Sequence, residues 1–431
     1  MKGFIIAAPS SGSGKTTVTL ALLRLLRNKG VKVSSGKAGP DFIDPQFHTL
    51  ALAKECVNFD PWGMREALLL DQASNTTSND EILLIEAMMG LFDGAANGTG
   101  SAADLAKLLN LPIILVIDCA KLSHSVAAIV HGFKSFRNDI EIAGVILNKV
   151  GSVRHEHMLR TAIRPLGIKV FGAVMRDDAL SLPERHLGLV QAFEHPLMDQ
   201  FIENAARKLG NAIAVDDVLD SLCDLHHANF EPVAKIPRLG QHIAVAKDLA
   251  FSFIYPHLIE GWKEQGAEIR FFSPLSDEGP DDNCDGIFLP GGYPELHADA
   301  LSHADDFRKK MLQAAERGIK IYGECGGYMA LGEGLIDADG THHKMLGLLP
   351  VETSFSERKR NLGYRRLELT NDFLGVTQLN AHEFHYSTEV KNTTKAPLFS
   401  AQDALGKDLG AFGAQVNNIA GSYMHIIDRA D

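Results

Sequence analysis

The chain has 431 residues, which is long for one domain and predicts two or three. Its composition is that of a globular protein, with 45% hydrophobic and 22% charged residues. The formal net charge of −12 argues against nucleic acid or an anionic membrane as the main partner, because both require a basic surface.

The cysteines are scattered along the chain without a C-x-x-C pair. They are Cys56, Cys119, Cys223, Cys284 and Cys325. This pattern argues against a disulfide framework or a zinc site and favours a reducing compartment. The apolar run GFIIA near the N-terminus is too short for a signal peptide or a membrane span, so we expect a soluble, cytoplasmic protein.

The first part of the chain, from residue 3 to about 190, alternates short apolar, β-rich runs with amphipathic helical stretches. The predicted strands are GFIIAA, EILLIEA, PIILVIDC, IAGVILNKV and VFGAV. Strands separated by helices predict an α/β domain with a parallel, doubly wound sheet.

The stretch APSSGSGKTT, residues 8–17, has the pattern of a phosphate-binding P-loop between a strand and a helix. Gly14, Lys15 and Thr16 match the end of G-x-x-x-x-G-K-[ST], but Pro9 stands where the first glycine is expected. If Ala8 is the small residue instead, five residues rather than four separate it from Gly14. The order strand, glycine-rich turn, helix still favours phosphate binding. The predicted nucleotide-binding residues are Ser11, Gly12, Ser13, Gly14, Lys15, Thr16 and Thr17.

Several acidic residues of this domain are candidates for holding Mg²⁺ or the substrate. Glu86 stands at the end of the apolar run in the predicted strand EILLIEA, where parallel sheets place a carboxylate beside the P-loop, and it joins Thr16 and Asp41 as a predicted Mg²⁺ ligand. Asp44 in GPDFIDP and Asp93 in MGLFDG are predicted substrate-binding residues. The alternative for the three aspartates is helix capping or turn formation, which Asp often performs near Gly and Pro.

Asn148 and Lys149 stand at the end of the strand IAGVILNKV. Both can hydrogen-bond an adenine edge from the rim of the sheet, and Asn148 is the predicted nucleotide contact; a plain turn is the alternative. Partition-type ATPases carry an extra lysine five residues before the P-loop lysine, and here Ser10 stands there. This difference argues against a filament-forming or positioning ATPase.

The segment 191–240 mixes helical and coil signals and ends in PVAKIPRLGQ, so it is the predicted linker between domains 1–190 and 241–431. A further α/β pattern follows, with strands in HIAVAKD, EIRFFSP and GIFLPGG and a helix near PHLIEGWKEQG. The C-terminal residues are richer in polar, strand-like pieces.

The stretch IKIYGECGGYMAL has the order strand, G-x-C-x-G, helix, which is the pattern of a nucleophile elbow around Cys325. The helix N-terminus predicts a lowered pKa for this thiol. Gly291 and Gly292 in LPGGYPE end the preceding strand, and we expect their N–H groups to bind the oxyanion of a tetrahedral intermediate. A buried, inert cysteine is the alternative.

Three histidines are candidates for the base that accepts the thiol proton: His382 and His385 in HEFHYS, and His425 in GSYMHIID. On a strand, residues three apart point to opposite faces, so His382 and His385 cannot both face the thiol. HEFH also lacks the spacing of a helical zinc site. His425 follows an aromatic strand in the chain order of Cys-then-His amidotransferases, so it is the predicted base. Ammonia released there would have a use at the phosphate site.

Eight stretches along the whole chain carry a family resemblance: APSSGSGKTTVTLALLR, GPDFIDPQFH, MGLFDG, LPERHLGLVQA, AFSFIYP, LPGGYPE, GECGGYM and HEFHYS. With them the chain resembles the cobyrinic or hydrogenobyrinic acid a,c-diamide synthases of corrinoid biosynthesis. The N-terminal domain is similar to dethiobiotin synthetase, whose P-loop has the same five-residue spacing. The C-terminal domain resembles a class I glutamine amidotransferase with a flavodoxin-like fold.

The resemblance implies a ligase that amidates the a and c acetate carboxylates of a corrin polycarboxylate. Its co-substrates would be ATP and L-glutamine, its metal Mg²⁺, and its intermediate an acyl phosphate attacked by ammonia. A homodimer is compatible with it, and no nucleic acid or membrane is expected. The polyanionic corrin needs basic groups, which ERKRNLGYRR offers: Arg358, Lys359, Arg360, Arg365 and Arg366. A solvated charge run is the alternative for some of them.

One departure from the resemblance concerns the histidine. In other class I amidotransferases a glutamate two places later orients it, and here that position is Ile427. The alternatives are a cobyric acid synthase, a Ni-sirohydrochlorin a,c-diamide synthase, or a non-catalytic ATP-binding regulator, which the joint presence of Cys325 and His425 disfavours. The stretches NFDPWGM and RHLGLVQAFE favour a metal-free corrin as substrate.

Overall fold

The computed structural model describes residues 1–78, 80–181, 184–185, 188–189, 197–226 and 232–430. Two compact units make up the chain: Met1–Trp62 with Glu66–Val233, and Gly63–Arg65 with Ala234–Asp431. Most of LPERHLGLVQA and RHLGLVQAFE lies outside the described residues. No helix in the described part of the chain is long and apolar enough to cross a membrane. All five cysteines are described, and none forms a disulfide.

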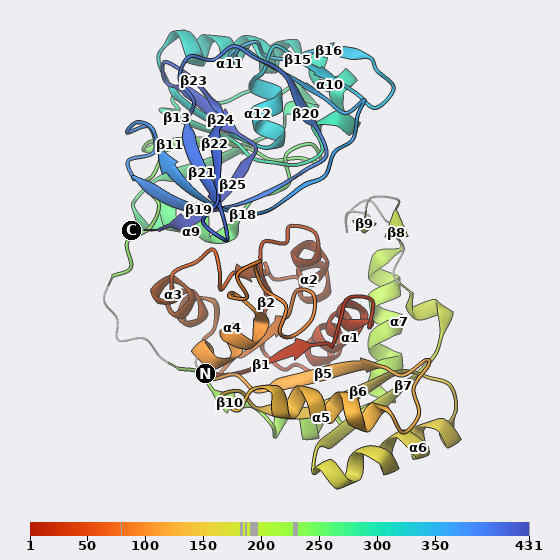
Figure 1. The fold of residues 1–431 in the computed structure, drawn as a ribbon. Coiled ribbons are helices and arrows are strands. Elements are labelled where there is room, and N and C mark those ends of the chain that lie inside the picture. The colour runs from red at the N-terminus through yellow and green to blue at the C-terminus, as the bar shows by residue number, and fades with distance from the viewer. Residues whose placement is uncertain (79, 182–183, 186–187, 190–196, 227–231, 431) are drawn as a thin grey trace. The chain divides into compact units, whose positions relative to one another are not determined.

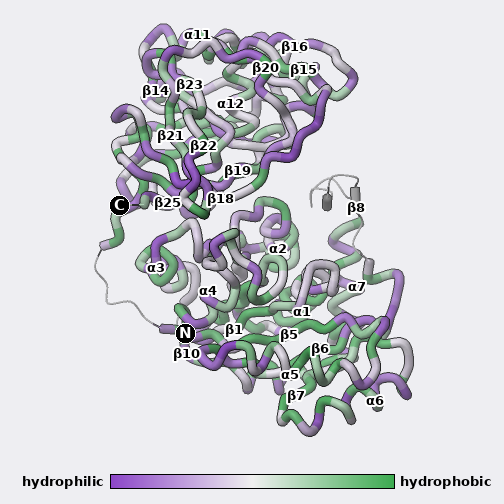
Figure 2. Tube along the Cα trace, viewed as in Figure 1, coloured by the Kyte–Doolittle hydropathy of each residue, from purple (hydrophilic) through white to green (hydrophobic). Residues whose placement is uncertain are grey.

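The first unit is built on a sheet of order β3-β2-β4-β1-β5-β6-β7, in which neighbouring strands run parallel; the short β10 pairs antiparallel with β1. The strands are β1 (Lys2–Ala7), β2 (Val33–Ala38), β3 (Val57–Phe59), β4 (Ile82–Glu86), β5 (Ile113–Asp118), β6 (Ile142–Val150), β7 (Lys169–Met175) and β10 (Cys223–Asp224). Figure 2 shows the apolar residues that run along β1, β5 and β6. The predicted apolar strands correspond to β1, β4, β5, β6 and β7.

Helices cover both faces of this sheet because alternate residues of each strand point to opposite sides. The helices are α1 (Lys15–Asn28), α2 (Asp44–Leu52), α3 (Glu66–Thr76), α4 (Ala102–Leu109), α5 (Val126–Phe136), α6 (Val153–Ile163), α7 (Met198–Gly210) and α8 (Val215–Leu219). Phe4 and Ile6 belong to one buried cluster with residues of α1, α2 and α7. In Figure 1, α5 and α6 lie together on the opposite side of the sheet. The first unit therefore has the doubly wound fold that the sequence predicts.

The predicted linker, residues 191–240, contributes two helices to the first unit. Helix α7 buries Ile202, Ala205 and Leu209 in the same cluster as α1. Their spacing of three and four places them on one face of a helix, which gives α7 an apolar stripe. Helices α7 and α8 therefore belong to the first unit, and the chain enters the second unit at Ala234, inside the segment that the sequence predicts as a linker.

The second unit is built on a sheet of order β12-β11-β13-β14-β24-β23, parallel from β12 to β24. Its strands are β11 (His242–Ala246), β12 (Glu268–Phe272), β13 (Gly286–Leu289), β14 (Lys320–Glu324), β23 (Ala414–Val416) and β24 (Ile419–Ser422). The helices are α9 (Pro256–Glu264), α10 (Ala298–Ser302), α11 (Asp305–Glu316) and α12 (Gly326–Leu331). The predicted strands and helix at the start of this unit are β11, β12, β13 and α9, so the α/β pattern of the C-terminal domain is confirmed.

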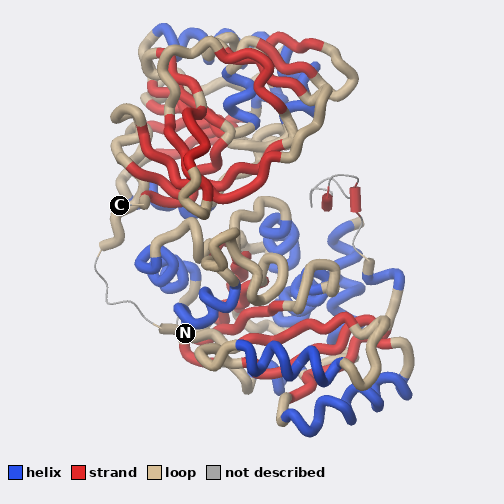
Figure 3. Tube along the Cα trace, viewed as in Figure 1, coloured by secondary structure: helices blue, strands red, loops and turns tan. Residues whose placement is uncertain are grey.

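Two further sheets complete the second unit, and Figure 3 shows that strands make up much of it. A five-stranded antiparallel sheet has the order β22-β21-β18-β19-β25, and a four-stranded sheet has the order β16-β15-β17-β20. Their strands are β15 (Gly334–Ile336), β16 (His342–Lys344), β17 (Val351–Ser354), β18 (Asn361–Leu369), β19 (Gln378–His385), β20 (Thr388–Asn392), β21 (Phe399–Asp403), β22 (Asp408–Phe412) and β25 (Met424–Arg429). Strands β19 and β25 bring the candidate histidines of this unit side by side.

Candidate functional site

The P-loop of the first unit connects β1 to α1 and has two glycines in the left-handed region. Gly12 has φ 79° and Gly14 has φ 82°. A Cβ on Gly14 would lie 2.2 Å from Asn148 Nδ2, so glycine is required there for space as well as for conformation. A cavity of about 750 Å³ opens beside the loop, lined by the loop residues and by residues of β5, β6 and the segment after β7. Its size suits a nucleotide.

Two residues at the end of β6 brace the P-loop. Asn148 Nδ2 donates to the Ser13 carbonyl at 2.9 Å, and Lys149 Nζ donates to the Gly12 carbonyl at 2.9 Å while pairing with Asp118 at 2.7 Å. Asn148 lines the cavity, but its amide nitrogen is engaged by the loop. An adenine contact by Asn148 therefore stays a prediction, and its observed part is to hold the loop in shape.

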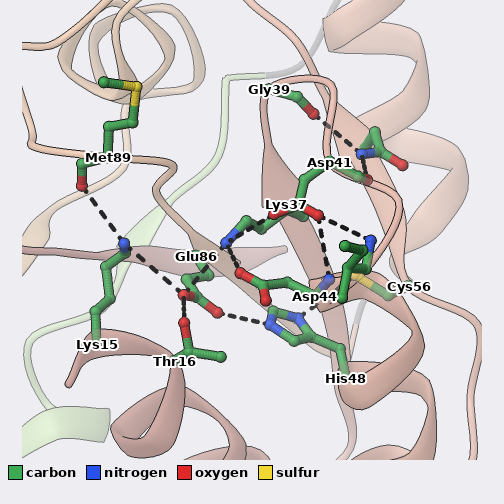
Figure 4. Close-up of polar contacts among 12 residues, drawn as sticks. Lys15, Thr16, Lys37, Gly39, Asp41, Asp44, His48, Cys56, Glu86 and Met89 are labelled. Carbon is green, nitrogen blue, oxygen red and sulfur yellow. Dashed lines mark hydrogen bonds and ion pairs between the residues drawn. The ribbon is translucent and has the colours of Figure 1, made fainter. Parts of the chain in front are cut away.

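Glu86, the last residue of β4, is the centre of the polar cluster beside the loop (Figure 4). Its Oε1 accepts from Thr16 Oγ1 at 2.7 Å and lies 3.3 Å from Lys37 Nζ and 3.9 Å from Lys15 Nζ. Its Oε2 lies 2.7 Å from His48 Nε2. Burial raises the pKa of this carboxyl, but Lys37 and His48 outweigh burial and hold the pKa below its usual range. Glu86 is therefore a buried, ionised carboxylate.

Lys37 near the end of β2 is a buried cation of this cluster, and the sequence patterns did not predict it. Its Nζ bonds to Asp44 and lies 3.6 Å from Asp41 Oδ2. Burial lowers the pKa of Lys37, but the carboxylates around it raise the pKa by more, so the side chain is charged. A lysine inside the strand VSSGKA, just before GPDFIDP, is the signal that could have identified it.

The predicted aspartates have capping or pairing contacts as well. Asp41 Oδ1 accepts from the backbone N–H of Ile43 at 2.8 Å and of Asp44 at 3.2 Å at the start of α2. Burial raises the pKa of Asp44 to about 6, although Lys37 opposes this shift. The Asp93 Oδ2 accepts from the Gly90 N–H at 2.8 Å, which closes a turn, and the Asp93 side chain is exposed. The capping and turn roles are thus present, and binding roles for the three stay predictions.

His48 of α2 is another residue that the sequence patterns did not single out, although it ends the stretch GPDFIDPQFH. It is fully buried and lies between Glu86 and Cys56, whose Sγ is 3.5 Å from His48 Nδ1. Burial lowers the pKa of His48, but Cys56 and Glu86 raise it to about 10. The charged ring therefore fixes the orientation of the Glu86 carboxylate.

Cys325 in the second unit lies between β14 and α12 with φ 45° and ψ −102°, a strained conformation for a residue with a side chain. Close packing forms this elbow, since a Cβ on Gly327 would lie 1.9 Å from the Leu289 carbonyl oxygen. The elbow geometry is the one expected. The expected lowering of the thiol pKa is wrong: burial raises the pKa of Cys325, and the Glu295 charge adds to this effect.

Gly291 holds the position between the thiol and the candidate base. A Cβ there would lie 2.3 Å from His425 Cε1 and 3.2 Å from Cys325 Cβ, so only glycine lets the two residues meet. The backbone N–H groups of Gly292 and Gly326 act to lower the pKa of the thiol, and the thiol itself donates to the Phe384 carbonyl at 3.9 Å. These two donors thus suit an oxyanion, and an oxyanion contact by the Gly291 N–H stays a prediction.

The three candidate histidines lie on neighbouring strands. His382 of β19 is directly opposite His425 of β25. Both ring nitrogens of His385 already have partners, since Nδ1 lies 2.9 Å from the Ser387 carbonyl and Nε2 lies 3.0 Å from Glu383 Oε1. Burial, with smaller effects from His382 and His385, lowers the pKa of His425 to about 3. The ring of His425 is therefore neutral, as a base must be.

The basic stretch ERKRNLGYRR is divided by the structure. Arg365 is largely buried and pairs with Glu383, with Nε 2.8 Å and an Nη 2.6 Å from the same oxygen. It is therefore a structural residue and is not part of a free basic patch. Arg358, Lys359, Arg360 and Arg366 are exposed.

Comparisons with known proteins cover the whole chain. Residues 4–190 match the CobQ/CobB/MinD/ParA nucleotide binding domain, and residues 242–431 match the CobB/CobQ-like glutamine amidotransferase domain. The chain is 55% identical over 428 residues to the hydrogenobyrinate a,c-diamide synthase of Rhizobium meliloti (strain 1021), with 99% of each chain covered. It is also similar to the proteins of that name from Brucella suis biovar 1 (strain 1330), at 55% over 432 residues and 99% of each chain, and from Mesorhizobium japonicum, at 46% over 437 residues with 100% and 99% covered.

Proposed function

The chain belongs to the hydrogenobyrinate a,c-diamide synthase family, and on this premise we propose that it amidates the a and c acetate carboxylates of hydrogenobyrinic acid with ATP and glutamine. One observation supports this most: a single chain contains both a P-loop beside an ionised carboxylate and a thiol elbow beside a neutral histidine. The P-loop site suits phosphoryl transfer, and the thiol site suits release of ammonia from an amide.

Amidation first requires a good leaving group on the corrin carboxylate. A carboxylate oxygen attacks the γ-phosphorus of ATP, the bond to the β,γ-bridging oxygen breaks, and ADP leaves with the electron pair. Lys15 and Lys37 are the cations proposed to offset the charge on the phosphoryl oxygens. Asp44 holds Lys37 in place and is thereby proposed as a substrate-site residue. Ammonia then attacks the acyl carbon, phosphate leaves, and the new amide loses the surplus proton.

Mg²⁺ fits the oxygen donors of the first unit. Thr16, Glu86 and Asp41 are the proposed ligands, and the Thr16 hydroxyl already contacts the Glu86 carboxylate. Among the described residues no three His, Cys, Asp or Glu side chains form a metal site by themselves, so we include phosphate oxygens and water in the proposed ligand set. The ion would supply further positive charge at the transferring phosphoryl group.

Glutamine hydrolysis is assigned to the second unit. The Cys325 thiol passes its proton to His425, and the sulfur attacks the carbonyl carbon of the glutamine side chain. The N–H groups of Gly292 and Gly326 are proposed to stabilise the oxyanion. The amide nitrogen takes the proton from His425 and leaves as ammonia, and water then hydrolyses the thioester to glutamate.

The test is an assay of the purified protein with ATP, Mg²⁺ and glutamine on two corrins side by side. Hydrogenobyrinic acid should lose two carboxylate charges, with two ATP consumed per corrin, and cobyrinic acid should react more slowly. Faster conversion of cobyrinic acid would change the proposed substrate to the cobalt form. ATP hydrolysis without amidation of either corrin would refute the function.

A further inference from the structure

Glu324 is a fully buried carboxyl side chain directly before the Cys325 nucleophile. It ends β14, whose other side chains include the buried Ile321 and Tyr322, and it is 2% exposed. A buried carboxylate is costly unless hydrogen bonds or charges compensate it. Its position at the elbow therefore calls for a compensating partner.

The partner that the geometry offers is the candidate base. Glu324 Oε2 lies 3.8 Å from His425 Nδ1, and its Oε1 accepts from the backbone N–H of Ile426 at 3.2 Å. The Tyr322 hydroxyl is near enough to affect its pKa. Among the described residues, no lysine or arginine forms an ion pair with Glu324. The backbone contact to Ile426 anchors the carboxylate beside the histidine.

The usual source of such a carboxylate is missing from β25. The residue two places after His425 is Ile427, which is buried and has no polar side chain. Glu324 reaches the same imidazole from a different strand, β14, so the histidine has a carboxylate neighbour after all.

We propose that Glu324 is the positioning residue of His425, supplying from β14 the carboxylate that position 427 lacks. The inference rests on the proposed glutaminase chemistry. A carboxylate facing Nδ1 favours the tautomer with its proton on Nδ1, which leaves Nε2 to accept the thiol proton. When the S–H bond breaks and the Nε2–H bond forms, the carboxylate stabilises the imidazolium until the proton passes to the leaving nitrogen.

The titratable groups around Glu324 set the expected pH dependence. Burial raises the pKa of Glu324 to about 8, so its charged form grows as pH rises through that value. The other groups that face this site are His382, His385, Glu295, Tyr322 and Cys325 itself. Only the contribution of Glu324 should vanish when it alone is made neutral.

The variant Glu324→Gln keeps the shape and removes the charge. We expect kcat for release of glutamate from glutamine to fall roughly 10- to 100-fold with little change in KM. The rise of this activity around pH 8 should also disappear. Synthesis with ammonium should stay near the wild-type rate. The matched control is Glu389→Gln, which removes a carboxylate that binds the Tyr328 hydroxyl at 2.7 Å, and it should lose less than twofold.

The conservative variant Glu324→Asp keeps the charge. Relative to Glu324→Gln it should recover part of kcat and part of the rise in activity around pH 8, which is called the pH 8 limb below. If Glu324→Gln does not fold, Glu324→Asp is compared with the wild type by the pH dependence of Cys325 alkylation with iodoacetamide. An unchanged kcat and pH profile in Glu324→Gln, or an alkylation profile without a pH 8 limb in the wild type, would overturn the proposal. If the wild type does not amidate the corrin with ammonium, the proposed function is wrong. The proposal for Glu324 is tested separately, because glutamate release and alkylation do not need the corrin.

Discussion

The two sites lie at the same place in their folds, the carboxyl end of a central parallel strand, but they treat charge in opposite ways. At the end of β4, Lys37 and His48 offset the burial of Glu86, so the carboxylate is ionised. After β14, burial is not offset, and Cys325 and His425 are held neutral. Phosphoryl transfer needs fixed charges before the substrate arrives, whereas thiol chemistry creates its charges during the reaction.

The largest expected effect is that of Cys325→Ala, which should abolish the reaction of the thiol site and leave that of the P-loop site intact. Cys325→Ala should lower glutamine-dependent amidation by roughly 10⁴-fold or more, since the proposed nucleophile is lost. Amidation at high ammonium concentration should stay near the wild-type rate, because the charged cluster of the first unit is intact. Product formation is followed with each nitrogen donor. An equal loss with both donors would break the division between the units.

A large effect on both donors is expected from the first unit. Glu86→Gln should lower amidation by about 10²- to 10³-fold with glutamine and with ammonium alike, because the fixed negative charge is lost. The control is Glu81→Gln, directly before the start of β4, where the side chain pairs with Lys54 at 2.5 Å. Steady-state rates at saturating Mg²⁺ are compared. A near-normal rate for Glu86→Gln would make this residue structural.

His48 tests whether the fixed charge also needs a fixed orientation. His48→Asn should lower the rate roughly 10- to 100-fold and raise the Mg²⁺ concentration needed for half-maximal activity, because Glu86 loses its 2.7 Å partner. His48→Gln, whose amide can approach the position of Nε2, should recover part of the loss. The Mg²⁺ dependence of ATP binding, measured by calorimetry, gives a readout without turnover. If neither titration moves, His48 does not hold Glu86 for the metal.

The smallest effect is on the pH dependence of folding stability, and it tests whether His425 at the thiol site is neutral. His425 has a folded pKa of about 3, against about 6.5 in an unfolded chain, so the unfolded state binds a proton first as pH falls. Stability is therefore lost from about pH 6.5 down to about pH 3. Between pH 7.5 and pH 5, the free energy of unfolding of His425→Asn should fall by about 2 kcal/mol less than that of the wild type.

The measurement for this prediction is urea unfolding of the second unit at the two pH values. In a Trp62→Phe background, Trp262 is the remaining tryptophan and reports on this unit. An equal loss of stability in the wild type and in His425→Asn would mean that the histidine is not held neutral.

The sequence predicted those strands that consist mainly of apolar residues, because such runs indicate burial. The strands β1, β4, β5 and β6 are runs of apolar residues and were placed correctly. Strand β2 was missed because its buried residues include Ser34, Ser35 and Lys37, which carry no apolar signal. Helix α7 was not predicted because its segment mixes helical and coil signals. The role of its apolar stripe follows from its packing against α1, which the sequence alone does not show.

The sites were predictable where a local motif defines them. The P-loop and the Cys325 elbow are contiguous stretches, so the sequence located them. The partners of these motifs come from distant parts of the sequence. Lys37 and His48 contact Glu86 from β2 and α2, and His425 of β25 lies near Cys325, with Gly291 beside both. The direction of the Cys325 pKa was predicted wrongly because the helix dipole was considered and burial was not.

The most direct test of the account uses glutamine labelled with ¹⁵N in its side-chain amide. The wild-type protein, given hydrogenobyrinic acid, ATP and unlabelled ammonium at low concentration, should produce a diamide with ¹⁵N in both new amides. Cys325→Ala, given the same labelled glutamine and a high concentration of unlabelled ammonium, should produce the same diamide without ¹⁵N. Label in the product of Cys325→Ala, or unlabelled amides from the wild type, would contradict the claim that the thiol site supplies the nitrogen and the phosphate site activates the acid.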